Sequence, residues 1–83
     1  MAKVVSYSQA RRLQKQGDGY IIYYGKEAGQ DSWWYTEDYQ LAIDLILPLV
    51  GEDRKLAEFA EAACNGRRIS RQFCQRIVQG RTP

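Results

Sequence analysis

The sequence predicts an α+β fold in which an N-terminal helix and a two-stranded antiparallel hairpin pack on a C-terminal unit of three helices. Two observations support this class. β-Branched and aromatic residues concentrate in two short runs within residues 20–35, and helical apolar spacing marks the segments on either side. The 83 residues, 45% hydrophobic and 27% charged, suffice for one core. We therefore expect residues 1–83 to form a single domain.

The first helix is expected over residues 7–16. Ser6 and Gln9 have the spacing of a capping box, in which the Ser6 hydroxyl accepts a hydrogen bond from the backbone of Gln9. Gly17 suits the left-handed conformation that ends many helices. These signals place a turn between the first helix and the hairpin.

The hairpin is expected over residues 20–35. Residues 20–24 are entirely β-branched or aromatic and predict one strand, and residues 32–35 predict the returning strand. Residues 25–31 contain two glycines and are predicted to form a polar loop, longer than a tight two-residue turn.

The aromatic residues of the hairpin are candidates for partner binding. Neighbouring side chains point to opposite faces of a strand, and we expect helices to cover one face only, so some aromatic rings should stay exposed. Exposed Trp and Tyr anchor protein interfaces or stack on bases. In the alternative interpretation, loops bury these rings as a second small core. The candidates are Tyr23, Trp33, Trp34 and Tyr35.

Three helices are expected over residues 37–50, 53–64 and 70–79. Thr36, followed by two acids, predicts the N-cap of the first of them, and Pro48 predicts a kink or an early end. The second carries its apolar residues on one face, which we expect to point inward. That face consists of Leu56, Phe59, Ala60 and Ala63.

Charge is strongly segregated along the chain although the net charge is only +2. Residues 1–26 hold five basic residues and one acid, residues 27–62 hold nine acids and two basic residues, and residues 63–83 hold five arginines and no acid. Segregated charge creates local fields that steer charged partners. In the alternative, the acidic and basic blocks face each other in the fold.

The sequence lacks the residues that several kinds of chemistry require. The sequence has no histidine, the usual general base near neutral pH, and its glycines show no phosphate-loop or dinucleotide pattern. Cys64 and Cys74 have no zinc-ligand spacing, and small buried thiols are favoured over a disulfide bridge. No run of apolar residues is long enough to cross a bilayer. We therefore expect a cytoplasmic protein that is not an enzyme and holds no metal or cofactor.

The last predicted helix turns polar residues outward, because its apolar residues occupy the opposite phase. Arginine and glutamine match the major-groove edges of guanine and adenine. A merely solvated basic helix is the alternative interpretation. The candidate binding residues of this region are Arg67, Arg68, Arg71, Gln72, Gln75, Arg76 and Gln79.

The run Arg-Ile-Ser-Arg-Gln-Phe-Cys-Gln-Arg-Ile-Val-Gln-Gly, residues 68–80, resembles the turn and recognition helix of repressor-type helix-turn-helix proteins. The matching positions are Ile69, Ser70, Cys74, Ile77 and Gly80. The sequence departs from that family at Arg67, where a small apolar residue is usual, and at Arg68, where glycine is usual. The resemblance covers 13 residues and implies DNA binding through residues 53–80, as a dimer.

Two functions follow as hypotheses. The first is a stoichiometric inhibitor of a host nucleic-acid-processing complex, of the anti-restriction or anti-CRISPR type that phages and mobile elements encode. Its acidic residues 27–62 would occupy arginine and lysine sites that normally hold phosphates. The alternative is a DNA-binding transcriptional regulator. Both predict a monomer or homodimer with a protein partner or direct DNA contact, and no membrane.

Overall fold

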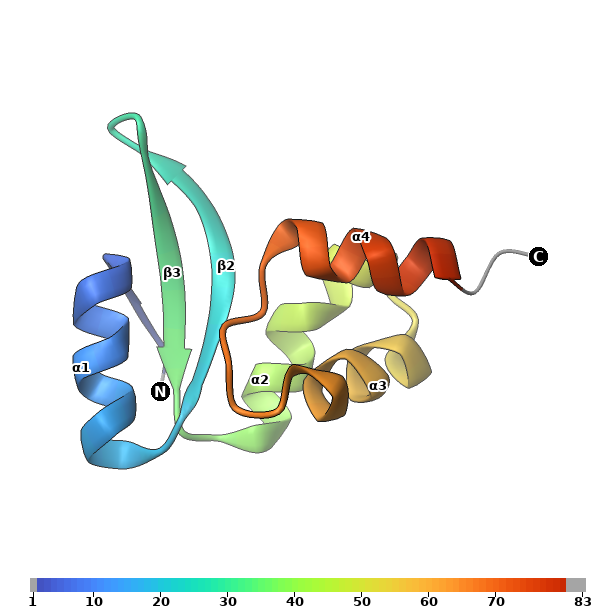
Figure 1. Cartoon of the computed structure of the whole chain (residues 1–83), viewed down its shortest axis with the longest axis horizontal. Helices are drawn as coiled ribbons and strands as arrows, with labels where there is room; N and C mark the ends of the chain where they lie inside the picture. Colours follow the sequence, from blue (N-terminus) through green and yellow to red (C-terminus); the bar gives the residue numbers. More distant parts are fainter. Residues whose placement is uncertain (1, 81–83) are drawn as a thin grey trace.

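The computed structural model describes residues 2–80 and confirms the α+β class. Figure 1 shows the sheet between helix α1 on one side and helices α2 to α4 on the other. The elements in chain order are β1 (Lys3–Val5), α1 (Tyr7–Gly17), β2 (Tyr20–Glu27), β3 (Gln30–Thr36), α2 (Tyr39–Ile46), the 3-10 helix η1 (Leu47–Val50), α3 (Arg54–Cys64) and α4 (Arg71–Gly80).

The sheet has three strands, so the prediction of a two-stranded sheet was wrong by one strand. All pairs are antiparallel, and the strand order is β1-β3-β2. In β1, Val4 pairs with Trp34 of β3. Strand β1 has only three residues, two of them exposed, so its sequence shows no alternation of apolar and polar side chains. This strand forms because β3 offers it a partner.

The turn of the hairpin is tighter than predicted. Strands β2 and β3 leave only Ala28 and Gly29 between them, and both residues have positive φ angles, 52° and 81°. That combination is typical of the two-residue turns that match strand twist. The register shifts between Tyr23 and Gly25, where β2 carries a bulge. The glycines and charges of this part of β2 made the sequence resemble a loop.

Helix α1 begins as predicted and ends one residue later. The Ser6 hydroxyl accepts from the backbone nitrogen of Gln9 at 3.3 Å. The left-handed residue is Asp18 (φ 54°) rather than Gly17. Gly17 is required for packing instead, because a Cβ atom there would clash with the Glu37 carboxylate and lie 2.7 Å from the hydroxyl oxygen of Tyr35.

Helix α2 starts later and ends earlier than predicted. Its N-cap is Asp38, which accepts from the backbone nitrogen of Leu41 at 3.2 Å, while Thr36 still belongs to β3. The predicted break at Pro48 is confirmed, since α2 stops at Ile46 and η1 follows. For α4, the predicted Ser70 cap is confirmed by its hydroxyl, which accepts from the backbone nitrogen of Phe73 at 3.0 Å.

The sheet is covered on both faces, which contradicts the expectation of helices on one face only. The cluster between the sheet and the C-terminal helices includes Ile22, Ile43, Ile46, Ile69 and Cys74. A second cluster, between the sheet and α1, consists of Ala10, Ile21, Trp33 and Tyr35. The chain therefore builds two small cores, one on each side of β2 and β3.

Candidate binding surface of arginine and aromatic residues

The aromatic candidates of the hairpin divide into core and surface. Trp33 is 4% exposed and Tyr35 is 6% exposed, so these two candidates do not lie on the surface but belong to the second small core, as the alternative interpretation had it. Helix α1 covers them, and the Tyr35 hydroxyl accepts from the backbone nitrogen of Gly19 at 3.1 Å. Tyr23 and Trp34 are half-buried and each contributes part of its ring to the surface.

The polar face of α4 lies where the sequence placed it. Cys74 is buried, Phe73 and Ile77 are half-buried, and the opposite side of the helix is open to solvent. The exposed residues are Arg71, Gln72, Gln75, Arg76 and Gln79.

The segment between α3 and α4, residues 65–70, runs to the edge of the sheet. The backbone nitrogen of Ile69 donates to the carbonyl of Ile21 at 2.8 Å, and that of Tyr23 donates to the carbonyl of Ile69 at 2.9 Å. A helix-turn-helix joins its helices by a turn of about three or four residues. This longer connection, held by the sheet, departs from the geometry implied by the resemblance.

This connection places Arg68 over two aromatic rings. Its guanidinium carbon lies 4.7 Å from the ring centroid of Tyr7 and 5.4 Å from that of Trp33. The two rings are themselves 5.6 Å apart. Cation–π contact of this kind orients the guanidinium without an acidic partner. Sequence reasoning missed Tyr7, because nothing in its local pattern indicates that a residue 61 positions later packs on it.

Two hollows meet beside the N-terminal half of α4. The first, about 280 Å³, opens between the hairpin and α4, and the second, about 490 Å³, opens between the connection and α4. Arg68, Ser70 and Gln72 line both. We call the exposed polar residues around these hollows the arginine face; its members are Arg67, Arg68, Arg71, Gln72 and Arg76. Tyr23 and Trp33 reach the first hollow, whereas Trp34, Tyr35, Gln75 and Gln79 line neither.

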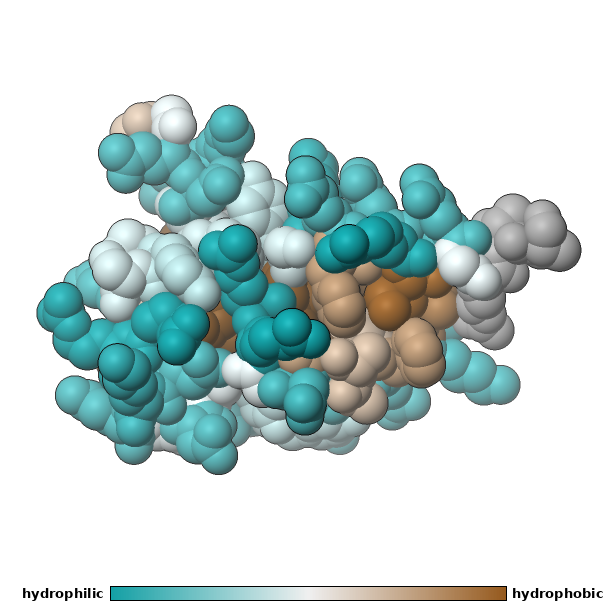
Figure 2. All heavy atoms as spheres, viewed as in Figure 1, coloured by the Kyte–Doolittle hydropathy of each residue, from teal (hydrophilic) through white to brown (hydrophobic). Residues whose placement is uncertain are grey.

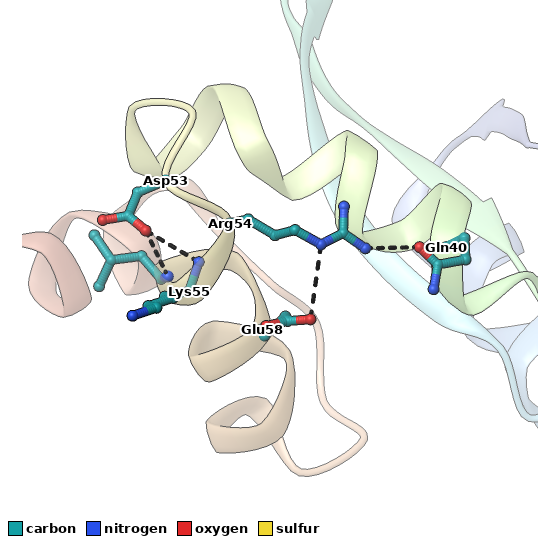
Figure 3. A network of polar contacts seen from close by, with 6 residues as sticks. Gln40, Asp53, Arg54, Lys55 and Glu58 are labelled. Carbon is teal, nitrogen blue, oxygen red and sulfur yellow. Dashed lines mark hydrogen bonds and ion pairs between the residues drawn. The ribbon is translucent and has the colours of Figure 1, made fainter.

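The arginine face has little compensating negative charge. Residues 2–80 form a single ion pair, between Arg54 Nε and Glu58 Oε2 at 3.8 Å on α3. None of the arginines of the arginine face is therefore ion-paired within these residues. Arg54 also donates to Gln40 at 2.7 Å, which ties this pair to α2 (Figure 3). Within residues 2–80, the acidic block of the sequence therefore forms no ion pair with the arginines of this surface.

Asp31 is the acid that lines the first hollow. Its Oδ1 atom accepts a hydrogen bond from the Tyr23 hydroxyl at 3.1 Å. Desolvation raises the pKa of Tyr23, the hydrogen bond and charge of Asp31 raise it further, and the charge of Arg71 lowers it. The phenol is thus a protonated donor at neutral pH, and Asp31 is held on the hairpin side of the hollow.

A separate apolar groove lies between α3 and α4. Phe59, which the sequence placed on the inward face of α3, is 59% exposed and lines this groove together with Ile77. Leu56 and Ala60 are buried as predicted, and Ala57 and Cys64 complete the buried side of α3. Ala63, which was also predicted to point inward, is exposed. Figure 2 shows the apolar surface between the two helices in brown.

Both cysteines are free, buried thiols. The thiol of Cys64 donates to the carbonyl of Arg67. Burial raises the pKa of Cys64, and it raises the pKa of Cys74 to about 11, with the nearby Cys64 adding to the effect. Neither thiol is an activated nucleophile at neutral pH.

The raised thiol pKa predicts a loss of stability at alkaline pH. The unfolded chain releases the Cys74 proton near the ordinary value of 9.0, and the folded chain near 11, so unfolding is favoured as pH rises from about 9 to 11. Urea denaturation at pH 8, 9, 10 and 11 should show the free energy of unfolding falling more steeply for the native protein than for Cys74→Ala. Equal slopes would contradict the burial of this thiol. The Cys74→Ala variant should still lose some stability at alkaline pH, because desolvation also raises the pKa values of Cys64, Tyr20, Tyr23 and Tyr35.

Within residues 2–80, no three His, Cys, Asp or Glu side chains gather closely enough to hold a metal ion. The same residues form no helix with the length and apolar character that a membrane crossing requires. Comparisons of the chain with models of protein families, with curated proteins and with solved structures find no match.

Proposed function

We propose that this protein binds nucleic acid through the arginine face, as a non-enzymatic cytoplasmic module. The observation that supports the proposal is the set of four exposed arginines on one surface without an acidic partner from residues 2–80. Guanidinium groups bind phosphate oxygens through two parallel hydrogen bonds. Asp31 is one acid at the edge of this surface against four arginines, and phosphates would supply the further negative charge.

Helix α4 offers groups that suit base edges as well as phosphates. Arg71 and Arg76 match guanine, and the glutamines between and after them match adenine. Because residues 65–70 are tied to β2, this helix would dock as a single exposed helix beside a hairpin rather than as a helix-turn-helix pair. Arg67 and Arg68 would contact the backbone next to it.

Fluorescence anisotropy with a labelled 20-base-pair duplex, at 50, 100 and 200 mM salt, tests this proposal. Each phosphate contact contributes about −0.9 to the slope of log affinity against log salt, so three to four contacts predict a slope of roughly −3. Affinity would then fall about 60-fold between 50 and 200 mM. The same strand without its complement shows whether duplex geometry matters. Absence of binding at 50 mM salt would overturn the proposal.

A second candidate function is the stoichiometric inhibitor of a nucleic-acid-processing complex. The apolar groove with its exposed Phe59 favours it, because protein interfaces bury aromatic and arginine side chains together, whereas phosphate binding makes no use of an exposed apolar ring. Such an inhibitor would ignore naked duplex DNA. Added to a restriction endonuclease or CRISPR effector, it would stop cleavage with an endpoint near one equivalent.

A further inference from the structure

The groove between α3 and α4 has an apolar floor and basic rims. Leu56, Phe59 and Ile77 supply the apolar side chains, and Lys55 and Arg76 stand at its sides. The hollow measures about 470 Å³, within the range of ordinary ligand sites. At the end of α4, a Cβ atom added to Gly80 would meet no atom of residues 2–80 within 4 Å.

We propose that this groove binds an acidic amphipathic segment of a partner protein. Apolar side chains of the segment would cover Phe59 and Ile77, and its carboxylates would lie against Lys55 and Arg76. This is the helix-in-groove mode of recognition, in which one apolar face is anchored and the flanking charges give specificity. The groove shares Arg76 with the arginine face, but the inference rests on its apolar residues and Lys55, which the arginine face does not include, and it names a partner for the second candidate function.

The charges at the rims select an acidic partner. Neither Lys55 nor Arg76 is ion-paired within residues 2–80, and Glu58, three residues after Lys55, pairs with Arg54 (Figure 3). An acidic segment would provide both rims with partners at the edge of an apolar contact, where charge pairs are least screened. A basic or neutral apolar segment would leave them unpaired.

The same charges disfavour a second copy of this chain as the occupant. In a two-fold dimer, each groove faces the same groove of the other copy. Such a contact would bring Lys55 and Arg76 of one copy toward Lys55 and Arg76 of the other. Like charges opposed across an interface weaken it. The groove thus suits a different chain better than its own copy.

Three labelled 16-residue peptides test the inference by fluorescence anisotropy. The first has leucines at helical spacing and glutamates elsewhere, the second replaces every glutamate by lysine, and the third scrambles the first. We expect the acidic amphipathic peptide to bind at least tenfold more tightly than the other two. Equal affinity of the acidic and scrambled peptides, or binding of none at 1 mM protein, would overturn the inference.

Variants of the groove locate the binding. Phe59→Ala should weaken binding of the acidic peptide at least tenfold, and Lys55→Glu should weaken it while improving binding of the lysine peptide. The matched control is Tyr39→Ala, which removes another exposed ring, 39% exposed on α2, and should change nothing. Circular dichroism checks that each variant folds. Unchanged peptide binding in Phe59→Ala would overturn the inference.

Two further readouts separate the groove from other interpretations. Phe59→Ala should leave duplex binding unchanged, so failure of the peptide test and failure of the nucleic-acid proposal are distinct results. Light scattering of the native protein at 10 and 500 μM gives its oligomeric state. A dimer that forms at high concentration and disappears in Phe59→Ala would identify a second copy as the occupant and overturn the inference.

Discussion

Replacing Trp33 by alanine is expected to lower the free energy of unfolding by about 3–5 kcal/mol, the usual range for removing a large buried ring. Trp33 is 4% exposed and packs against the rings of Tyr7 and Tyr23, at 5.6 and 5.2 Å between centroids. Its ring also forms one of the two cation–π contacts of the Arg68 guanidinium. Because domains of this size are stable by only about 5–15 kcal/mol, a large part of the protein's stability depends on this one side chain.

Chemical denaturation followed by circular dichroism measures this effect, with Tyr24→Ala as the control. Tyr24 is an aromatic residue of the neighbouring strand β2, but it is 43% exposed and contacts Trp34 through one ring edge. Its removal should cost less than about 1.5 kcal/mol. If Trp33→Ala lowers the free energy of unfolding as little as Tyr24→Ala and also weakens binding to a partner, Trp33 belongs to the binding interface and not to the core.

The parts of the fold that depend on neighbouring residues could be predicted from the sequence. Ser6 and Ser70 cap their helices because a hydroxyl reaches the backbone nitrogen three residues ahead, which is a local contact. Pro48 ends α2 because proline lacks the donor that the helix needs. The phase of α4 was equally local, since Cys74 and the polar residues opposite it follow one helical period.

The parts that could not be predicted depend on contacts between distant segments. Strand β1 forms only because β3 lies beside it. The burial of Trp33 depends on α1 returning over the second face of the sheet, which no local pattern encodes. Gly17 illustrates the same limit, because its role is set by the approach of Tyr35 and not by the turn that follows it.

The candidate site was predicted in composition but not in arrangement. The outward face of α4 follows from its own period, whereas the position of Arg68 depends on Ile69 pairing with β2. The exposure of Phe59 likewise depends on how α4 packs against α3. Apolar periodicity identifies the apolar face of a helix, but it does not indicate how much of that face a neighbouring helix covers.

Reversing the charge of Arg71 or Arg76 is expected to weaken duplex binding about tenfold or more at 50 mM salt, because each variant loses a phosphate contact and adds a repulsion. The salt slope should become shallower by about 1 in each variant. The thermal midpoint should stay nearly fixed, because both side chains are exposed and neither is ion-paired within residues 2–80.

Arg12→Glu is the matched control for Arg71→Glu and Arg76→Glu. It makes the same change in net charge on the exposed side of α1, but Arg12 lines neither hollow of the arginine face. If all three variants weaken binding equally, total charge governs association and the arginine face has no special part in it. If Arg76→Glu lowers the thermal midpoint and leaves binding intact, its partner is an acid of this chain. Loss of binding in the two α4 variants alone, with stability unchanged, is the result that an anionic partner docked on this face requires.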